Sequence, residues 1–265
     1  MSGGGAGALA DEAVIRVVVE GAVRRLVIDN ATQRNALRPA MSQALTAALR
    51  EAGDDDACRA IVLHGEGDAF CSGGDVRQIA EQQALAPARQ TERLTAINEL
   101  VRAIRRCPRP VIAAVEGDAA GAGASLAFAC DLVVASRSAR FAVAHVRLGI
   151  SPDGGATLAL PRAVPMQLAN EWLMQGEAIG AERLHGVGLV NRIVAPGEAV
   201  NEALRWARSL ATGSAEALAS IKMLVGDACW PELDRHLERE RTEFVRTMFG
   251  AGALERVQAF LRRRS

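Results

Sequence analysis

Two glycine-bearing segments contain the residues whose types and spacing could do chemistry. One runs from Gly65 to Asp75, and the other contains Gly117, Gly121 and Gly123. Each follows an apolar run, and each is predicted to turn from a strand into a helix. Such a turn presents free backbone N–H groups and the positive end of a helix dipole. It therefore suits a phosphate group, or an oxygen that becomes negative during a reaction.

Three uses of these glycines compete. They could simply make turns, although two such segments after two strands weaken that interpretation. A dinucleotide site is disfavoured because Leu126 stands where a third glycine would be, and a Walker loop is excluded because no Gly-Lys-Ser/Thr occurs. The third use is an oxyanion hole built from two backbone N–H groups, one from each segment.

The elements around these segments alternate between strands and helices. Apolar and β-branched runs predict strands at 14–19, 22–28, 60–63, 111–115 and 132–135, and helical spacing occurs at 35–50, 91–106 and 122–130. Residues 149–157 have the composition of a loop. From residue 165 onward the pattern is almost entirely helical, with one short strand expected at 190–194. The sequence therefore predicts an α/β core followed by a helical C-terminal part.

Composition restricts the class of protein. The 265 residues suffice for one sizeable core, and 31 basic against 31 acidic residues give no signal for a nucleic-acid partner. The five cysteines form no C-x-x-C pair, so neither a disulfide framework nor a metal site is expected. No apolar run could span a membrane, and residues 1–12 resemble a flexible tail, so we expect a cytoplasmic protein. Lys222 is the only lysine, so a phosphate-binding cation should be an arginine.

Six short motifs resemble, in this order, the enoyl-CoA hydratase/isomerase (crotonase) family. They are Asn35-Ala-Leu, Ala69-Phe-Cys-Ser-Gly-Gly-Asp75, Pro110-Val-Ile-Ala-Ala-Val-Glu-Gly117, Cys130-Asp-Leu, Gly188-Leu-Val-Asn191 and Ala259-Phe-Leu261. The resemblance implies a crotonase-like β-β-α spiral core over residues 13–200 and a helical trimerisation part over 201–265. It also implies acyl-CoA thioester substrates, no cofactor beyond the coenzyme A of the substrate, and a homotrimer or hexamer.

The resemblance assigns the two oxyanion donors to the N–H groups of Gly74 and Ala122. Ala122 occupies the middle position of the family's glycine triplet. A residue that opens a helix has negative φ, so alanine should leave the hole intact. Two such donors stabilise an enolate oxygen, and each contributes on the order of 3 kcal/mol in the transition state.

The sequence departs from the family's hydratases at both of their catalytic glutamates. Ser125 stands at the first position and His145 at the second. Water addition usually divides its proton transfers between two carboxylates, so hydratase activity is in doubt. Asp153 resembles the single catalytic acid of several isomerases of the family, although Pro-Asp-Gly-Gly is also good turn chemistry. We therefore favour a shift from 3-enoyl-CoA to 2-enoyl-CoA with Asp153 as base, its pKa raised by burial.

Two polar residues near Asp153 keep competing interpretations. His145 is either a second acid–base group or a polar structural neighbour. Ser125 is expected to face the acyl pocket rather than to act as a nucleophile. The alternatives to an isomerase are a hydratase, a non-catalytic binder of CoA thioesters and, less favoured, an acyl-CoA hydrolase or dehalogenase.

The remaining candidates concern binding of coenzyme A. Arg34 and Arg77 are either contacts to its phosphates and adenine or solvated surface arginines. Ser72, Asp75 and Val76 belong to the same candidate binding segment, and Asp75 is also interpreted as structural because it lies at the end of an element.

Overall fold

The structure is a computed structural model that describes residues 13–83 and 87–262 of the chain. The predicted tail at residues 1–12 lies outside the described residues. None of the described helices is both long and apolar enough to cross a bilayer.

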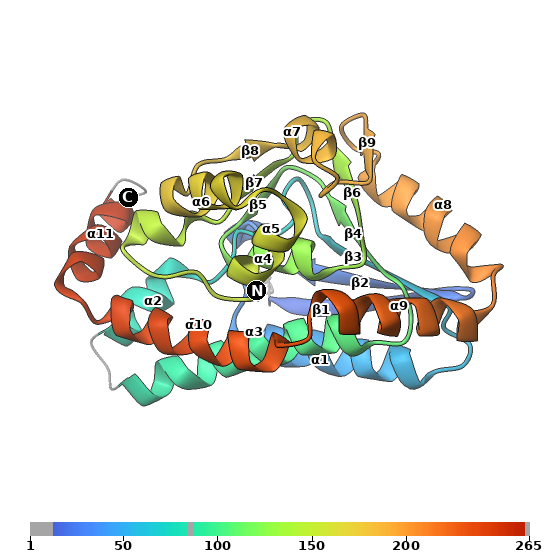
Figure 1. The fold of residues 1–265 in the computed structure, drawn as a ribbon, viewed down its shortest axis with the longest axis horizontal. Coiled ribbons are helices and arrows are strands. Elements are labelled where there is room, and N and C mark those ends of the chain that lie inside the picture. The colour runs from blue at the N-terminus through green and yellow to red at the C-terminus, as the bar shows by residue number, and fades with distance from the viewer. Residues whose placement is uncertain (1–12, 84–86, 263–265) are drawn as a thin grey trace, which may run out of the picture.

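A six-stranded sheet in the order β1-β2-β3-β4-β6-β9 forms the centre of the fold (Figure 1). Its strands are β1 (Val14–Glu20), β2 (Val23–Asp29), β3 (Ala60–Gly65), β4 (Val111–Val115), β6 (Leu132–Ser136) and β9 (Arg192–Val194). The first two strands pair as an antiparallel hairpin, and all the other neighbouring pairs are parallel. β3 and β4 are buried along their whole length, as expected for parallel strands covered on both faces.

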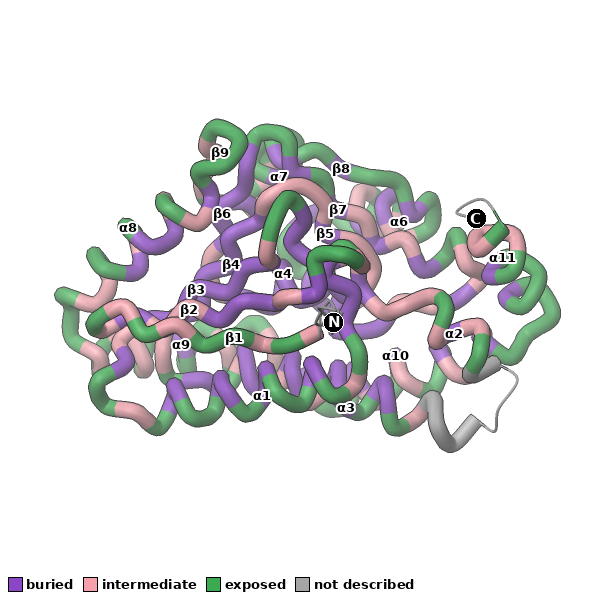
Figure 2. Tube along the Cα trace, turned by 180° about the vertical axis from the view of Figure 1, so that it is seen from behind, coloured by how far each residue is buried: buried purple, intermediate pink, exposed green. Residues whose placement is uncertain are grey.

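Helices cover the two faces of this sheet because successive strand residues point to opposite sides. Ala60 and Val62 of β3 pack with helix α8 (Ala199–Ala211) on one face. Ile61 and Leu63 pack on the other face with α1 (Pro39–Asp54), α3 (Pro87–Arg106) and α4 (Ala122–Ala129). Figure 2 shows the buried residues concentrated in β2, β3, β4 and β6 and on the inner side of α1.

A second, three-stranded sheet consists of β5 (Asp118–Ala120), β7 (Arg140–Ala142) and β8 (Ile179–Gly180). The chain passes from β4 to β5 and then into α4, and later from β6 to β7 and then toward α5 (Ala156–Ala163). The segment after β3 joins the same small sheet through a bridge between Cys71 and Ala119. This repeated passage from strand to strand to helix is the predicted spiral core.

The helical C-terminal part is confirmed. It comprises α9 (Ala215–Cys229), α10 (Leu233–Met248) and α11 (Ala251–Arg262), following α6 (Met166–Gln175) and α7 (Ala181–Gly186). α10 lies along α3 and α5, and α11 lies against α2 (Val76–Gln83), as Figure 1 shows. Residue 200, expected to end the core, is the second residue of α8, which packs on β3, β4 and β6.

Several predicted boundaries were wrong. The helix predicted from Asn35 begins at Pro39, because Asn35 has a left-handed φ of 57° and proline suits the first helical position. The predicted loop at 149–157 gives way to helix α5 at Ala156. The short strands β5 and β8 were missed, because two or three residues leave no periodic pattern and form strands only through pairing with β7.

Candidate active site

The N–H groups of Gly74 and Ala122 lie on neighbouring backbone segments. Ala122 is the first residue of α4, so its N–H has no acceptor within the helix. Gly73 packs directly on this helix start, since a Cβ placed on it would lie 3.1 Å from the Ala122 nitrogen. Within the described chain, neither N–H donates a hydrogen bond to another protein group. The two turns that carry these free N–H groups are in contact, as the predicted oxyanion hole requires, and the hole itself stays a prediction.

Glycine is required beside these donors by close contact and by backbone angle. A Cβ on Gly73 would lie 2.6 Å from the Ala120 carbonyl oxygen, and one on Gly123 would overlap the Cys71 carbonyl group. Gly121, which precedes α4, has φ 53° and ψ −127°, a conformation that side chains exclude. Alanine is tolerated at position 122, as predicted, because the positive φ and the closest backbone contacts fall on the neighbouring glycines.

Asp153 and His145 form a buried hydrogen-bonded pair beside this hole. His145 Nε2 lies 3.0 Å from Asp153 Oδ1, and the two side chains are 9% and 2% exposed. The His145 ring packs on Gly121, where a Cβ would lie 3.7 Å from Nε2. The short 3-10 helix Ala144–Leu148 carries His145, and the loop before α5 carries Asp153. The pair therefore adjoins the helix start that supplies the Ala122 donor.

Ser125 links the hole to the Asp153 loop. Its hydroxyl donates to the Asp153 carbonyl oxygen at 2.9 Å and lies 3.3 Å from the Gly121 carbonyl oxygen. Gly154 packs on the same side chain, since a Cβ there would lie 2.9 Å from Ser125 Cβ. Because its hydroxyl is engaged by carbonyl groups, Ser125 acts as a tie between two segments.

A buried arginine completes the cluster. Arg93 Nη2 of α3 lies 3.8 Å from Asp153 Oδ2, and Nη1 lies against Gly74. The guanidinium stands 5.0 Å from the ring centre of Phe244, which also contacts the His145 ring edge-on at 6.2 Å. Arg93 was not among the predicted site residues, although helical spacing puts it on the apolar stripe of α3 with Ile97 and Leu100. A charged residue on the apolar face of a helix could have identified Arg93 as a buried functional candidate from the sequence.

The expected rise in the pKa of Asp153 was wrong. Burial does act to raise the pKa of this carboxyl, but the charge and hydrogen bond of His145 and the charge of Arg93 outweigh it. The pKa of Asp153 therefore lies below its usual range. This lowered pKa keeps the buried carboxyl ionised rather than protonated.

Comparison with known proteins places this geometry in one family. Residues 19–265 match the family model described as Enoyl-CoA hydratase/isomerase. The chain belongs to the enoyl-CoA hydratase/isomerase (crotonase) family.

Similar proteins within this family carry both activity names. The 1,2-epoxyphenylacetyl-CoA isomerase of Escherichia coli (strain K12) is 35% identical over 93% of this chain and 95% of its own length. A probable enoyl-CoA hydratase of Rhodobacter capsulatus is 38% identical over 94% and 95%. The crystal structure of an enoyl-CoA hydratase from Polaromonas sp. JS666 matches at 42% identity with a TM-score of 0.81, covering 94% of this chain and 97% of that chain. This crotonase-family chain is therefore an acyl-CoA enzyme of the hydratase/isomerase type.

Three further predicted residues, Ser72, Asp75 and Val76, make local structural contacts. Asp75 accepts from the N–H of Arg77 at 2.9 Å, which fits its structural interpretation at the start of α2. Ser72 donates its N–H to the Arg34 carbonyl oxygen and its hydroxyl to Gln33. Val76 packs in a small apolar cluster with α11.

The two candidate coenzyme A contacts are both exposed. Arg34 pairs with Asp118, which also pairs with Arg140, and Arg77 lies on the first turn of α2. Their contact with coenzyme A stays a prediction. No cluster of three metal-ligating side chains occurs among the described residues.

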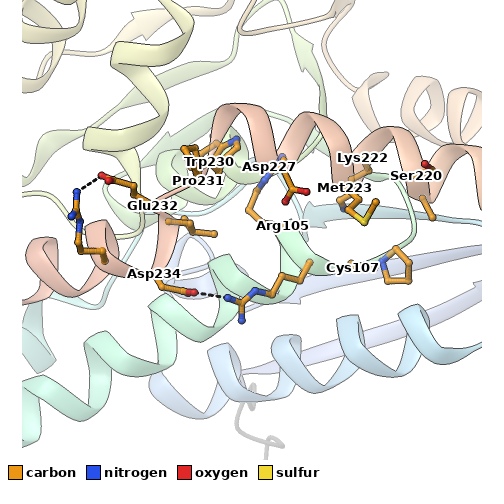
Figure 3. Close-up of a pocket in the computed structure, with 16 residues that line it drawn as sticks. Arg105, Cys107, Ser220, Lys222, Met223, Asp227, Trp230, Pro231, Glu232 and Asp234 are labelled. Atoms are coloured by element: carbon orange, nitrogen blue, oxygen red, sulfur yellow. Dashed lines mark hydrogen bonds and ion pairs between the residues drawn. The ribbon is translucent and has the colours of Figure 1, made fainter.

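A groove of about 990 Å³ lies away from the hole, between α9, the start of α10 and the end of α3 (Figure 3). Lys222 lines it, but this buried ammonium is already bound to the carbonyl oxygens of Ile104 and Arg109 and lies 2.6 Å from Asp131. Arg105, on the same wall, pairs with Asp131 at 3.2 Å and stacks on Trp230. The groove's central cations are therefore engaged, and it holds none of the predicted site residues.

Proposed function

We propose that this crotonase-family enzyme moves the double bond of an enoyl-CoA thioester from carbon 3 to carbon 2. The observation that carries the proposal is the buried carboxylate of Asp153, which is bound to His145 beside the hole. It is supported by the serine and histidine found at the positions of the hydratase glutamates.

In the proposed reaction the thioester oxygen binds the N–H groups of Gly74 and Ala122. Asp153 removes a proton from carbon 2, and the electrons spread over the dienolate, whose negative oxygen the two donors stabilise. The same carboxyl returns the proton to carbon 4, so the double bond forms between carbons 2 and 3 and the carboxylate is regenerated. His145 orients Asp153 through its Nε2. No electrons pass to an acceptor, so we propose no cofactor beyond the coenzyme A of the substrate.

Water addition is the second candidate function. The similar protein from Rhodobacter capsulatus is named a probable hydratase, whereas that from Escherichia coli is named an isomerase. A hydratase reaction here would have to divide its two proton transfers between Asp153 and His145, because Ser125 is engaged by carbonyl groups.

A deuterium experiment separates these functions. A 3-enoyl-CoA is incubated with the enzyme in D₂O, and the products are identified by mass spectrometry. We expect a conjugated 2-enoyl-CoA carrying deuterium, and we expect Asp153→Asn to lower kcat by about 10²- to 10⁴-fold while the affinity for the thioester changes little. Asp56→Asn, at an exposed turn, is the matched control and should retain wild-type kcat.

The other outcomes identify the alternatives. A 3-hydroxyacyl-CoA product would establish hydration. Binding without exchange of any proton would establish a non-catalytic binder, and free coenzyme A would establish a hydrolase. An Asp153→Asn enzyme with normal isomerisation would refute the assignment of the base.

A further inference from the structure

The loop that carries Asp153 is held by helix α10 on both sides of that residue. The N–H of Ser151 donates to Thr247 Oγ1 at 2.9 Å. Beyond Asp153, the N–H groups of Gly155 and Thr157 donate to the two carboxylate oxygens of Glu240 at 2.7 and 3.0 Å. Asp153 therefore lies on a short bridge whose two ends are tied to one helix.

Glu240 has no oxygen free to meet a substrate. Both of its carboxylate oxygens accept from protein donors, and the Thr157 hydroxyl also bonds to Oε1. His236, one turn earlier on α10, lies 2.7 Å from that hydroxyl through Nε2. Any effect of Glu240 on chemistry must therefore pass through the loop.

The loop needs an external tie because of its two glycines. Gly154 and Gly155 have left-handed φ values of 71° and 85°. Glycine reaches these angles without strain, but it has many other conformations available and loses more entropy than other residues when one is fixed. The acceptor oxygens of Glu240 select one conformation at Gly155, while Ser125 binds the Asp153 carbonyl group from the other side.

We propose that Glu240 is a positioning residue, which holds the Asp153 loop against α10 and thereby keeps the Asp153 carboxylate on His145 beside the oxyanion hole. The inference rests on the proposed function of Asp153. It adds a second buried carboxylate, on helix α10 of the C-terminal part, on which the geometry of the first depends.

The charge of Glu240 gives this role a pH dependence. The groups that face it are Asp153 from the loop and His236 from its own helix, with Arg93 and His145 beyond Asp153. Burial raises the pKa of Glu240 to about 7, the Thr157 and Gly155 bonds oppose this rise, and the charge of Asp153 adds to it. Below that pH the protonated carboxyl is a weaker acceptor, so the hold on the loop should weaken.

The test compares Glu240→Gln and Thr157→Val with Glu243→Gln, a matched change at an exposed glutamate of the same helix. In Glu240→Gln we expect kcat to fall at least tenfold with KM within about threefold of wild type, because displaced catalytic groups mainly affect the chemical step. In the wild-type enzyme we expect kcat to fall as the pH drops through about 7, where Glu240 becomes protonated. Glu240→Gln cannot ionise at this position, so this fall should be absent from its pH profile. Amide hydrogen exchange of residues 151–158 should become faster. Thr157→Val should show the same changes at smaller size, and Glu243→Gln none of them.

Several outcomes would overturn the inference. One is a folded Glu240→Gln enzyme with wild-type kcat and pH profile. Another is unchanged exchange at residues 151–158. If Glu240→Gln does not fold, Thr157→Val decides by the same two readouts. A wild-type enzyme that moves no double bond would instead refute the proposed function, and the exchange rates would still decide whether Glu240 holds the loop.

Discussion

Asp153 carries a charge in a place where water cannot solvate it. Its carboxylate is 2% exposed and is balanced by His145 at 3.0 Å and by Arg93 at 3.8 Å. An ionised base is ready to accept a proton, but the same neighbours that keep it ionised make it a weaker base. In the proposed reaction the two hole donors compensate for this by stabilising the enolate, so the base and the hole depend on each other.

The low pKa of Asp153 predicts a stability effect of Arg93. A carboxyl whose pKa is lower in the folded state stabilises the fold above its unfolded pKa, and this stabilisation is lost as the pH falls through the folded pKa. In Arg93→Met the pKa of Asp153 should rise, because the positive charge of the Arg93 guanidinium is gone. Urea unfolding from about pH 5 to about pH 3 should then show a smaller acid-induced loss of stability than in wild type.

The control is Arg38→Met, a change at an exposed arginine just before α1, which should lose as much stability on acidification as the wild-type protein. The prediction fails if Arg93→Met also loses stability to the wild-type extent.

The spacing of the two hole donors depends on how the start of helix α4 packs against the neighbouring turn. Gly123, its second residue, packs on the Cys71 carbonyl group, which belongs to the segment that carries Gly74. The two donors therefore keep their spacing only as long as this helix start and this turn remain in contact.

Gly123→Ala should separate the two segments. The new methyl group cannot fit beside the Cys71 carbonyl, so we expect a loss of about 1–3 kcal/mol in the free energy of unfolding. We also expect a fall in kcat of about 10²-fold, the effect of losing one oxyanion donor. Gly252→Ala is the matched control, because Gly252 is the second residue of α11 and a Cβ there would meet open space. Equal kcat in both variants would contradict the role of this contact.

Helix α9 exposes large apolar side chains on the surface of the molecule. Lys222 anchors it in the fold through the carbonyl oxygens of Ile104 and Arg109 and the carboxylate of Asp131. The same helix exposes a stripe of Ile221, Leu224 and Val225 at 58%, 60% and 51%. An exposed apolar stripe of this kind is typical of an interface between protein chains.

We expect this stripe to take part in the proposed trimer or hexamer. Light scattering on the eluted protein should give three or six chain masses for wild type. Leu224→Glu should shift the distribution toward single chains and lower the Tm, because it places a charge in an apolar contact. A wild-type mass of one chain, or an unchanged oligomer in Leu224→Glu, would count against α9 as the interface.

The sequence alone predicted the fold class, the two glycine turns and the position of Asp153. Apolar runs and apolar periodicity predicted the long strands and helices. The continuous apolar run at 111–115, for example, indicates a buried strand. Such patterns could not place β8 or the start of α5, because a two-residue strand and a turn of helix after Gly-Gly depend on the segments that pack against them.

From the chain alone came the two glycine-bearing turns between strand and helix, and the absence of a glutamate at positions 125 and 145. Only the tertiary structure decided which charges surround Asp153. Arg93 lies 60 residues before it and Glu240 lies 87 residues after it, and folding brings both to one loop. Electrostatic interactions act through space, so the lowered pKa of Asp153 follows from the contacts that folding makes with His145 and Arg93, whereas Glu240 acts on the loop through hydrogen bonds.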